Sequence, residues 1–188
     1  MCFVCIDIDG VILNMLDSIK DYLNEKGITF IPKNVVKYNF SGDIGCSRDY
    51  VFEALSNPKV FKQQKPYKGV LGSIIKLQRS HVQTNAYTTV SSTDIYKIRK
   101  DFCNQLNLSG DVYIGDKPVL LEADALFDDC LDEHKKWIEA GYTGKLYLID
   151  APYNQEYYNK DFLYFDKVIR CLDFNDAVSR YLKTLNKM

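Results

Sequence analysis

The chain has 188 residues, a length that suits one domain carrying an insertion. Its 24 Lys and Arg residues and 25 Asp and Glu residues give a formal net charge of −1, which argues against a protein whose main task is to grip nucleic acid. Hydrophobic residues make up 46% of the sequence and charged residues 26%, a mix typical of a soluble globular protein rather than a disordered one.

The six cysteines do not predict disulfides, because the sequence shows no sign of secretion. No basic region precedes the apolar run at the N-terminus, and that run meets Asp7 and Asp9 almost at once. We therefore expect neither a signal peptide nor a membrane span, and a reduced, cytoplasmic protein. Cys2 and Cys5 form a C-x-x-C pair within an expected strand, where buried thiols are favoured over a metal or redox pair.

Strands and helices are predicted to alternate along the chain, which favours a parallel sheet covered by helices. The expected elements are a strand over residues 2–7, a helix over 16–26, a strand over 82–88, a helix over 93–106, strands over 111–114 and 123–127, a helix over 132–140, a strand over 145–149 and a closing helix over 174–185. In the helix over 93–106, the spacing of Ile95, Ile98, Phe102 and Leu106 predicts one apolar stripe.

The stretch between Gly27 and Pro66 breaks this alternation. It has no clear core strand, and turn signals surround a short helical pattern near residues 49–55. Aromatic residues are concentrated there: Tyr38, Phe40, Tyr50, Phe52 and Phe61. Two interpretations stay open at this point, a small satellite core and a cap that closes over an active site.

Polar residues follow four of the expected strands. They are Asp7, Asp9 and Gly10 after the first strand, Thr88 and Thr89 at the end of the second, Gly115-Asp116-Lys117 after the third, and Asp128 and Asp129 after the fourth. A single strand-end Asp is often only a helix N-cap. Because ligands of open parallel sheets bind at the carboxyl ends of the strands, the four groups together predict a site.

The charges of these residues suggest metal-assisted phosphoryl transfer to water. Two Asp pairs at one rim would repel each other, and a divalent cation relieves that repulsion. An oxygen-rich site without His or Cys suits Mg²⁺. A lysine and a threonine hydroxyl beside the metal would bind a phosphoryl group, and an Asp can serve as a nucleophile that forms an aspartyl-phosphate.

The residues at these strand ends resemble the motifs of a known superfamily. Asp7-Ile8-Asp9-Gly10-Val11 resembles the first motif, D-x-D-G-[TV], of the haloacid dehalogenase superfamily. Thr88 is similar to its second motif, Lys117 to the third and Asp128-Asp129 to the acidic fourth, in the same order over the whole chain.

A narrower resemblance is to the small 5′(3′)-deoxyribonucleotidases and their bacterial and phage relatives. The segments that carry it are Asn57-Pro58-x-x-Phe61, Pro66-Tyr67-x-Gly69-Val70, Gly115-Asp116-Lys117 and Ala123-Asp124-Ala125-Leu126-Phe127-Asp128-Asp129.

The resemblance implies a role for each matched residue. Asp7 would attack phosphorus, and Asp9 would protonate the leaving oxygen and then activate water. Thr88 (or Thr89 beside it) and Lys117 would bind the phosphoryl oxygens. Gly10 would let the chain turn tightly beneath the phosphate. The Mg²⁺ ligands would be Asp7, the backbone carbonyl of Asp9, and Asp128, Asp129 or both.

The resemblance also implies an α/β fold with a Rossmann-like parallel sheet and a small, mainly helical cap inserted after the first strand. We place the core at residues 1–16 and 67–188 and the cap at 17–66. The aromatic cap residues Phe61, Tyr38 and Phe40 would then contact the substrate, with Phe61 as the first choice.

We therefore expect a Mg²⁺-dependent phosphatase for a (deoxy)nucleoside monophosphate. Another small phosphate ester, a nucleic-acid 3′-phosphate or a non-catalytic binding role on the same scaffold are the alternatives. The expected partner is a small phosphomonoester, not a membrane. The near-neutral charge makes nucleic acid an unfavoured partner, and homodimer formation is left open.

Overall fold

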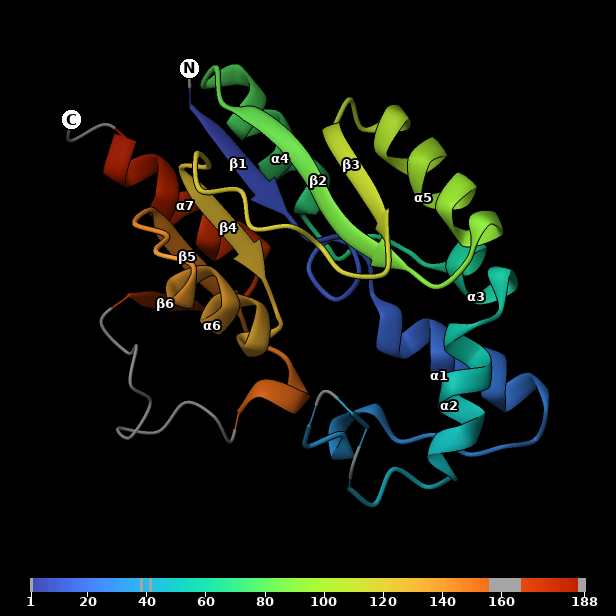
Figure 1. Cartoon of the computed structure of the whole chain (residues 1–188). Coiled ribbons are helices and arrows are strands. Elements are labelled where there is room, and N and C mark those ends of the chain that lie inside the picture. Colours follow the sequence, from blue (N-terminus) through green and yellow to red (C-terminus); the bar gives the residue numbers. More distant parts are fainter. Residues whose placement is uncertain (1, 38, 41, 156–166, 186–188) are drawn as a thin grey trace.

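The computed structural model of the protein describes residues 2–37, 39–40, 42–155 and 167–185. Its centre is a six-stranded sheet with the strand order β3-β2-β1-β4-β5-β6 (Figure 1). All neighbouring strands pair in parallel. The strands are β1 (Phe3–Ile6), β2 (Gln83–Val90), β3 (Ser109–Ile114), β4 (Ala125–Asp128), β5 (Lys145–Ile149) and β6 (Val168–Cys171).

Some helices cover the two faces of this sheet, and others form an insertion beyond its carboxyl end. The helices are α1 (Met15–Glu25), α2 (Arg48–Leu55), α3 (Pro58–Gln63), α4 (Val70–Arg79), α5 (Thr93–Gln105), α6 (Leu131–Glu139) and α7 (Phe174–Leu185), with short 3₁₀ turns at Pro32–Asn34 and Pro152–Asn154. Val4 and Ile6 of β1 belong to the larger core with α4, α5 and α7, whereas Cys5 points into a second core with α6. This alternation is what a buried parallel strand requires. The predicted fold class is confirmed.

Two core elements were absent from the sequence-based prediction, α4 and the edge strand β6. The strand β2 was expected, although its sequence is unusually polar for a parallel strand. The structure explains that polarity at the start of the strand, where Gln83 is exposed and Asn85 accepts a hydrogen bond from the Ser109 hydroxyl on the neighbouring edge strand. Farther along, Tyr87 and Thr88 are buried.

The insertion between β1 and β2 is mainly helical, as expected. Helices α1, α2 and α3 pack against one another, and α3 also packs against α5 of the core. Asn57 caps α3, because its side chain accepts a hydrogen bond from the Lys59 amide, and Pro58 follows at the first helical position. In Figure 1, these helices lie beyond the carboxyl ends of β1 and β2. The exact limits of the cap, residues 17 and 66, stay a prediction; α1 itself begins at Met15.

All six cysteines lie in the described part of the chain and carry free thiols. Burial raises the pKa of the Cys5 thiol to about 12, so it behaves as a packing residue. Over the residues that the structure describes, each helix is too short or too polar to cross a membrane.

Candidate active site

Three buried side chains form an ion-pair cluster at the carboxyl end of the sheet. Asp7 follows β1, Asp128 ends β4, and Lys117 lies on the loop after β3. The Nζ atom of Lys117 is 3.0 Å from Oδ2 of Asp128 and 3.7 Å from Oδ1 of Asp7. The same ammonium lies 4.8 Å from the centre of the Tyr87 ring and donates a hydrogen bond to the Tyr87 carbonyl oxygen. One lysine therefore balances carboxylates from two adjacent strands.

Backbone hydrogen bonds fix the two carboxylates of this cluster. Oδ1 of Asp7 accepts from the amide of Ile8 at 2.9 Å, and Oδ1 of Asp128 accepts from the amide of Cys130 at 2.7 Å. The Asp7 amide itself donates to the carbonyl of Phe127, which joins the ends of β1 and β4. Rigid strand ends thus hold the charged groups in place.

Burial dominates the electrostatics of the cluster. It raises the pKa of Asp7 to about 7, and the nearby Asp128 adds to that rise while Lys117 opposes it. Burial and the charge of Asp128 also hold the pKa of Asp129 well above its usual range. For Lys117, burial alone would lower the pKa, but Asp128 and Asp7 raise it above the ordinary lysine value. Lys117 is therefore charged at neutral pH.

Asp129 lies close to Asp7 and Asp128 and is held by two residues of the 3₁₀ turn that follows β5. The Tyr153 hydroxyl donates a hydrogen bond to Oδ2 of Asp129. The side-chain amide of Asn154 donates to the backbone carbonyl oxygen of Asp129 at 3.0 Å. Gly10 makes room for this arrangement, since a Cβ at Gly10 would lie 1.9 Å from Oδ2 of Asp129. Gly10 also has a φ of +90°, which strains other residues. Gly10, which was predicted to lie beneath the phosphate, is thus needed because Asp129 approaches it so closely.

These carboxylates satisfy the donor chemistry of a Mg²⁺ site. Asp7, Asp128 and Asp129 each offer an oxygen, and the offered oxygens all lie within 4.8 Å of one another. Hard carboxylate oxygens are the ligands that Mg²⁺ prefers, and a cation would relieve the repulsion that raises the pKa values of Asp7 and Asp129. The predicted metal ligands Asp7, Asp128 and Asp129 are thus brought together. The predicted role of the Asp9 carbonyl stays a prediction.

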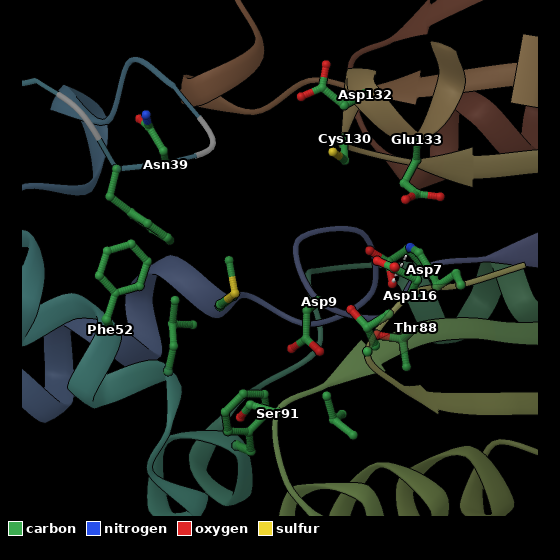
Figure 2. Close-up of a pocket in the computed structure, with 18 of the residues that line it drawn as sticks. Asp7, Asp9, Asn39, Phe52, Thr88, Ser91, Asp116, Cys130, Asp132 and Glu133 are labelled. Atoms are coloured by element: carbon green, nitrogen blue, oxygen red, sulfur yellow. Dashed lines mark ion pairs between the residues drawn. The ribbon is translucent and has the colours of Figure 1, made fainter. Parts of the chain in front are cut away.

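A cavity of about 690 Å³ opens in front of the cluster (Figure 2). Of the predicted residues, Asp7, Asp9, Thr88, Thr89, Lys117, Phe40 and Phe61 line it. Thr88 is buried, whereas Thr89 is exposed. Gly10, Asp128 and Asp129 are not part of the lining. Tyr38 lies outside the described residues.

The two walls of the cavity differ in chemistry. One wall carries Met15, the first residue of α1, and the cap residues Phe40, Phe52 and Leu55. The rings of Phe40 and Phe52 meet edge to face with 6.1 Å between their centres. The opposite wall carries the carboxylates of Asp116, Asp132 and Glu133 (Figure 2). Phe52 belongs to the aromatic residues concentrated in the insertion but was not among the predicted site residues. Asp116 was named only as part of the strand-end group Gly115-Asp116-Lys117, and Asp132 and Glu133 were left unassigned, although only two residues separate Asp132 from the Asp128-Asp129 pair.

Asp9 has a partner that sequence reasoning missed. The guanidinium of Arg99, on α5, donates from Nε to Oδ2 of Asp9 at 3.0 Å and from a second nitrogen to Oδ1 at 2.5 Å. The structure buries Ile95, Arg99 and Cys103 on α5, at a spacing of four residues. The predicted stripe shares Ile95, but its other members, Ile98, Phe102 and Leu106, are only partly buried. An arginine between two apolar positions of that spacing was the available signal.

No protein-family model and no curated protein sequence matches the chain. Solved structures do resemble it. A haloacid dehalogenase-like family hydrolase from Streptococcus pneumoniae shares 12% identity at a TM-score of 0.57 and covers 98% of both chains. A HAD family hydrolase from Deinococcus radiodurans, with bound phosphate and sodium, shares 13% identity at a TM-score of 0.58, over 97% of this chain and 95% of the other.

CbbY from Rhodobacter sphaeroides, in complex with phosphate, shares 10% identity at a TM-score of 0.52, over 93% of this chain and 95% of the other. At these identities the likeness establishes the fold. The chain therefore has the fold of haloacid dehalogenase-like hydrolases, with an acidic cluster at the carboxyl end of its sheet.

Proposed function

We propose that the protein is a Mg²⁺-dependent phosphatase that acts through an aspartyl-phosphate on Asp7. The observation that carries the proposal is the buried cluster of Asp7, Lys117, Asp128 and Asp129, of which Asp7 and Lys117 line a cavity of about 690 Å³. A cavity of this volume suits a small ligand. The phosphate-bound structures of the same fold support the choice of a phosphate ester.

In the proposed reaction, a carboxylate oxygen of Asp7 attacks the phosphorus atom. The bond from phosphorus to the ester oxygen breaks, and that oxygen takes a proton from Asp9. Water then attacks the phosphorus of the aspartyl-phosphate, gives a proton to Asp9 and releases inorganic phosphate, which restores Asp7. Lys117 and the Thr88 hydroxyl hold the phosphoryl oxygens during both steps.

Asp7, Asp128 and Asp129 would hold the metal ion. When bound, Mg²⁺ supplies positive charge that offsets the carboxylates and the phosphoryl group. Lys117 supplies the same kind of charge from the side of β3, and its contact with Asp7 keeps that carboxylate turned toward the cavity.

For the substrate, we propose a (deoxy)nucleoside monophosphate. The aromatic wall formed by Phe40, Phe52 and Phe61 offers faces and edges for a base. The acidic wall with Asp116, Asp132 and Glu133 would repel a second or third phosphate, which favours a monophosphate over a polyphosphate. Within the cap, Phe52 is 47% exposed and lines the cavity, so part of its side chain is accessible to a ligand.

The test is a panel of phosphate esters assayed for phosphate release with Mg²⁺. The panel contains deoxynucleoside and nucleoside monophosphates, sugar phosphates, p-nitrophenyl phosphate and a 3′-phosphorylated oligonucleotide, with Asp7→Asn as the inactive control. A kcat/KM at least ~10-fold higher for a nucleoside monophosphate than for the sugar phosphates supports the substrate assignment, on the scale of base stacking. Preference for a sugar phosphate or the oligonucleotide would replace it. No phosphate release from any ester would overturn the phosphatase proposal.

A further inference from the structure

Arg99 joins the proposed proton-transfer residue Asp9 to the cap. Its guanidinium donates to both carboxylate oxygens of Asp9, a fork geometry that fixes the orientation of a carboxylate as well as attracting its charge. The side chain of Arg99 is 1% exposed and that of Asp9 is 12% exposed. Water therefore screens this ion pair far less than a surface pair.

The same guanidinium is held by the cap helix α3 and the residue that follows it. The nitrogen that donates to Oδ1 of Asp9 also donates to Oε1 of Gln64. Another guanidinium nitrogen lies 3.5 Å from the Phe61 carbonyl oxygen, and the guanidinium carbon is 4.7 Å from the centre of the Phe61 ring. Arg99 on the core helix α5 thus makes three contacts with α3 and the residue that follows it. The same Arg99 side chain holds Asp9.

Gln64 has little else to hold it. Its Nε2 atom is buried and has no hydrogen-bond partner among the residues that the structure describes. The orientation of its amide therefore follows from the donor on Arg99. Neither Arg99 nor Gln64 lines the cavity, whereas Asp9 and Phe61 do. Arg99 and Gln64 can therefore affect the site only through the residues that they contact.

Asp9 stands apart from the other carboxylates of the site. Asp7, Asp128 and Asp129 cluster together, but the Asp9 side chain is not in that group. Figure 2 shows the Asp9 carboxylate turned away from Asp7 and toward the side of the cavity where Ser91 lies. The Arg99 fork accounts for this orientation, because it grips both oxygens.

We propose that Arg99 is a positioning residue that fixes the Asp9 carboxylate and ties its position to the cap helix α3 through Gln64. The inference rests on the proposed phosphatase function. It adds that the position of the Asp9 carboxylate depends on the packing of α3 against α5. In this scheme the side-chain contacts of Arg99 are with Asp9, Gln64 and Phe61, not with the phosphoryl group or the carboxylates of Asp7, Asp128 and Asp129.

The test is a double-mutant cycle on phosphate-ester hydrolysis with Mg²⁺. Arg99→Ala should lower kcat by ~10–100-fold, the scale expected when a reacting group is misplaced, with KM changed less than ~3-fold. On an Asp9→Asn background, Arg99→Ala should cost little further activity, because the group it positions is already lost. Arg99→Lys should not restore kcat, since an ammonium cannot grip two oxygens as a fork does. Lys97→Ala, on the exposed side of the same helix, is the matched control.

The outcomes separate this inference from the proposed function. Equal fold losses from Arg99→Ala on both backgrounds would show a general structural effect and overturn the inference, as would kinetics like those of Lys97→Ala. If Arg99→Ala does not fold, Gln64→Leu removes the Gln64 contact, leaves the Arg99 contacts with Asp9 and Phe61 in place, and should lower kcat with the same dependence on Asp9. A wild-type kcat in Gln64→Leu would then refute the link.

An inactive wild-type protein would overturn the phosphatase proposal instead. The link to the cap would still be measurable by amide hydrogen exchange over residues 58–64, which should be faster in Arg99→Ala and Gln64→Leu than in Lys97→Ala. Unchanged exchange would overturn it.

Discussion

Lys117 and Asp128 form a buried ion pair beneath the cavity, with 3.0 Å between Nζ and Oδ2. Asp128 is fully buried and Lys117 is 6% exposed, so removing either partner leaves an uncompensated charge in a protein interior. Because the same ammonium lies 3.7 Å from Asp7, it couples the proposed metal site to the proposed nucleophile. The pair therefore bears on both the stability and the chemistry of the site.

Lys117→Met should abolish most activity and also lower the melting temperature. The loss of one cation weakens phosphoryl binding and leaves Asp7 and Asp128 to repel each other. Lys117→Arg should not restore the rate, because a planar fork does not replace a compact ammonium. Steady-state kinetics and thermal melts check both effects, with Lys145→Met at an exposed position as the control. A Lys117→Arg enzyme with wild-type kinetics would refute the proposed role.

Asp7→Asn should eliminate turnover without unfolding the protein. An amide cannot form the aspartyl-phosphate, and the neutral side chain relieves the burial cost that raises the pKa of Asp7. The melting temperature of the metal-free variant should therefore equal or exceed that of the wild type. Phosphate release and thermal melts are the measurements, with Asp101→Asn on α5 as a matched control. Near wild-type hydrolysis of p-nitrophenyl phosphate by Asp7→Asn would show that the nucleophile lies elsewhere.

Mg²⁺ should stabilise the protein more at neutral than at acidic pH. Burial raises the pKa of Asp7 from 3.8 to about 7, so the folded metal-free protein keeps a proton that the unfolded chain has released in this range. Because the folded state binds more protons there, this group's contribution to stability falls as the pH rises from about 4 to about 7. A cation that takes the place of the proton removes that loss.

The check is the rise in melting temperature on adding Mg²⁺, measured at about pH 7.5 and about pH 5. The rise should be larger at the higher pH and should shrink in Asp128→Asn, which removes one ligand. EDTA should abolish activity, and Zn²⁺ should replace Mg²⁺ poorly because His and Cys ligands do not form part of the carboxylate cluster. An equal or larger shift at the acidic pH would contradict the proposed ligand set.

Phe52 and Phe61 should affect the substrate differently. Both line the cavity, but Phe52 is 47% exposed whereas Phe61 is 7% exposed and packs against Arg99. Phe52→Ala should lower kcat/KM for a deoxynucleoside monophosphate by ~10-fold while sparing p-nitrophenyl phosphate and the melting temperature, if base stacking is worth ~1–3 kcal/mol. Phe61→Ala should weaken nucleotide hydrolysis as well, and it should also lower the melting temperature.

The two aromatic variants are compared on both substrates and by thermal melts. A parallel loss on nucleotide and aryl phosphate in both variants would assign the rings to packing of the cap. That result would remove the residue-level support for a nucleotide substrate and leave the phosphatase chemistry intact.

Most of the central residues of the site could be predicted from their places at the ends of the expected strands. Asp7, Thr88, Lys117 and Asp128 each follow or end an expected strand, and parallel strands bring such positions to one edge of a sheet. That rule depends only on local periodicity and chain order, so the sequence was sufficient. The helices α1, α5, α6 and α7 were predicted from the sequence, although the buried face of α5 is Ile95, Arg99 and Cys103 rather than the predicted stripe.

Contacts between distant segments were decided only by the tertiary structure. The two hydrogen bonds from Arg99 to Asp9 join residues that are 90 positions apart in the sequence. The sequence around either residue does not indicate that the other is its partner. The same holds for the close approach of Asp129 to Gly10 and for the aromatic wall around Phe52. The edge strand β6 was missed because Ile169 and Arg170 at its centre are only partly buried, so it lacks the continuous apolar run that marked the equally short β4. Local sequence determines which elements form and which strand ends carry charged residues, whereas the packing of elements that are distant in the sequence decides which charged groups come into contact.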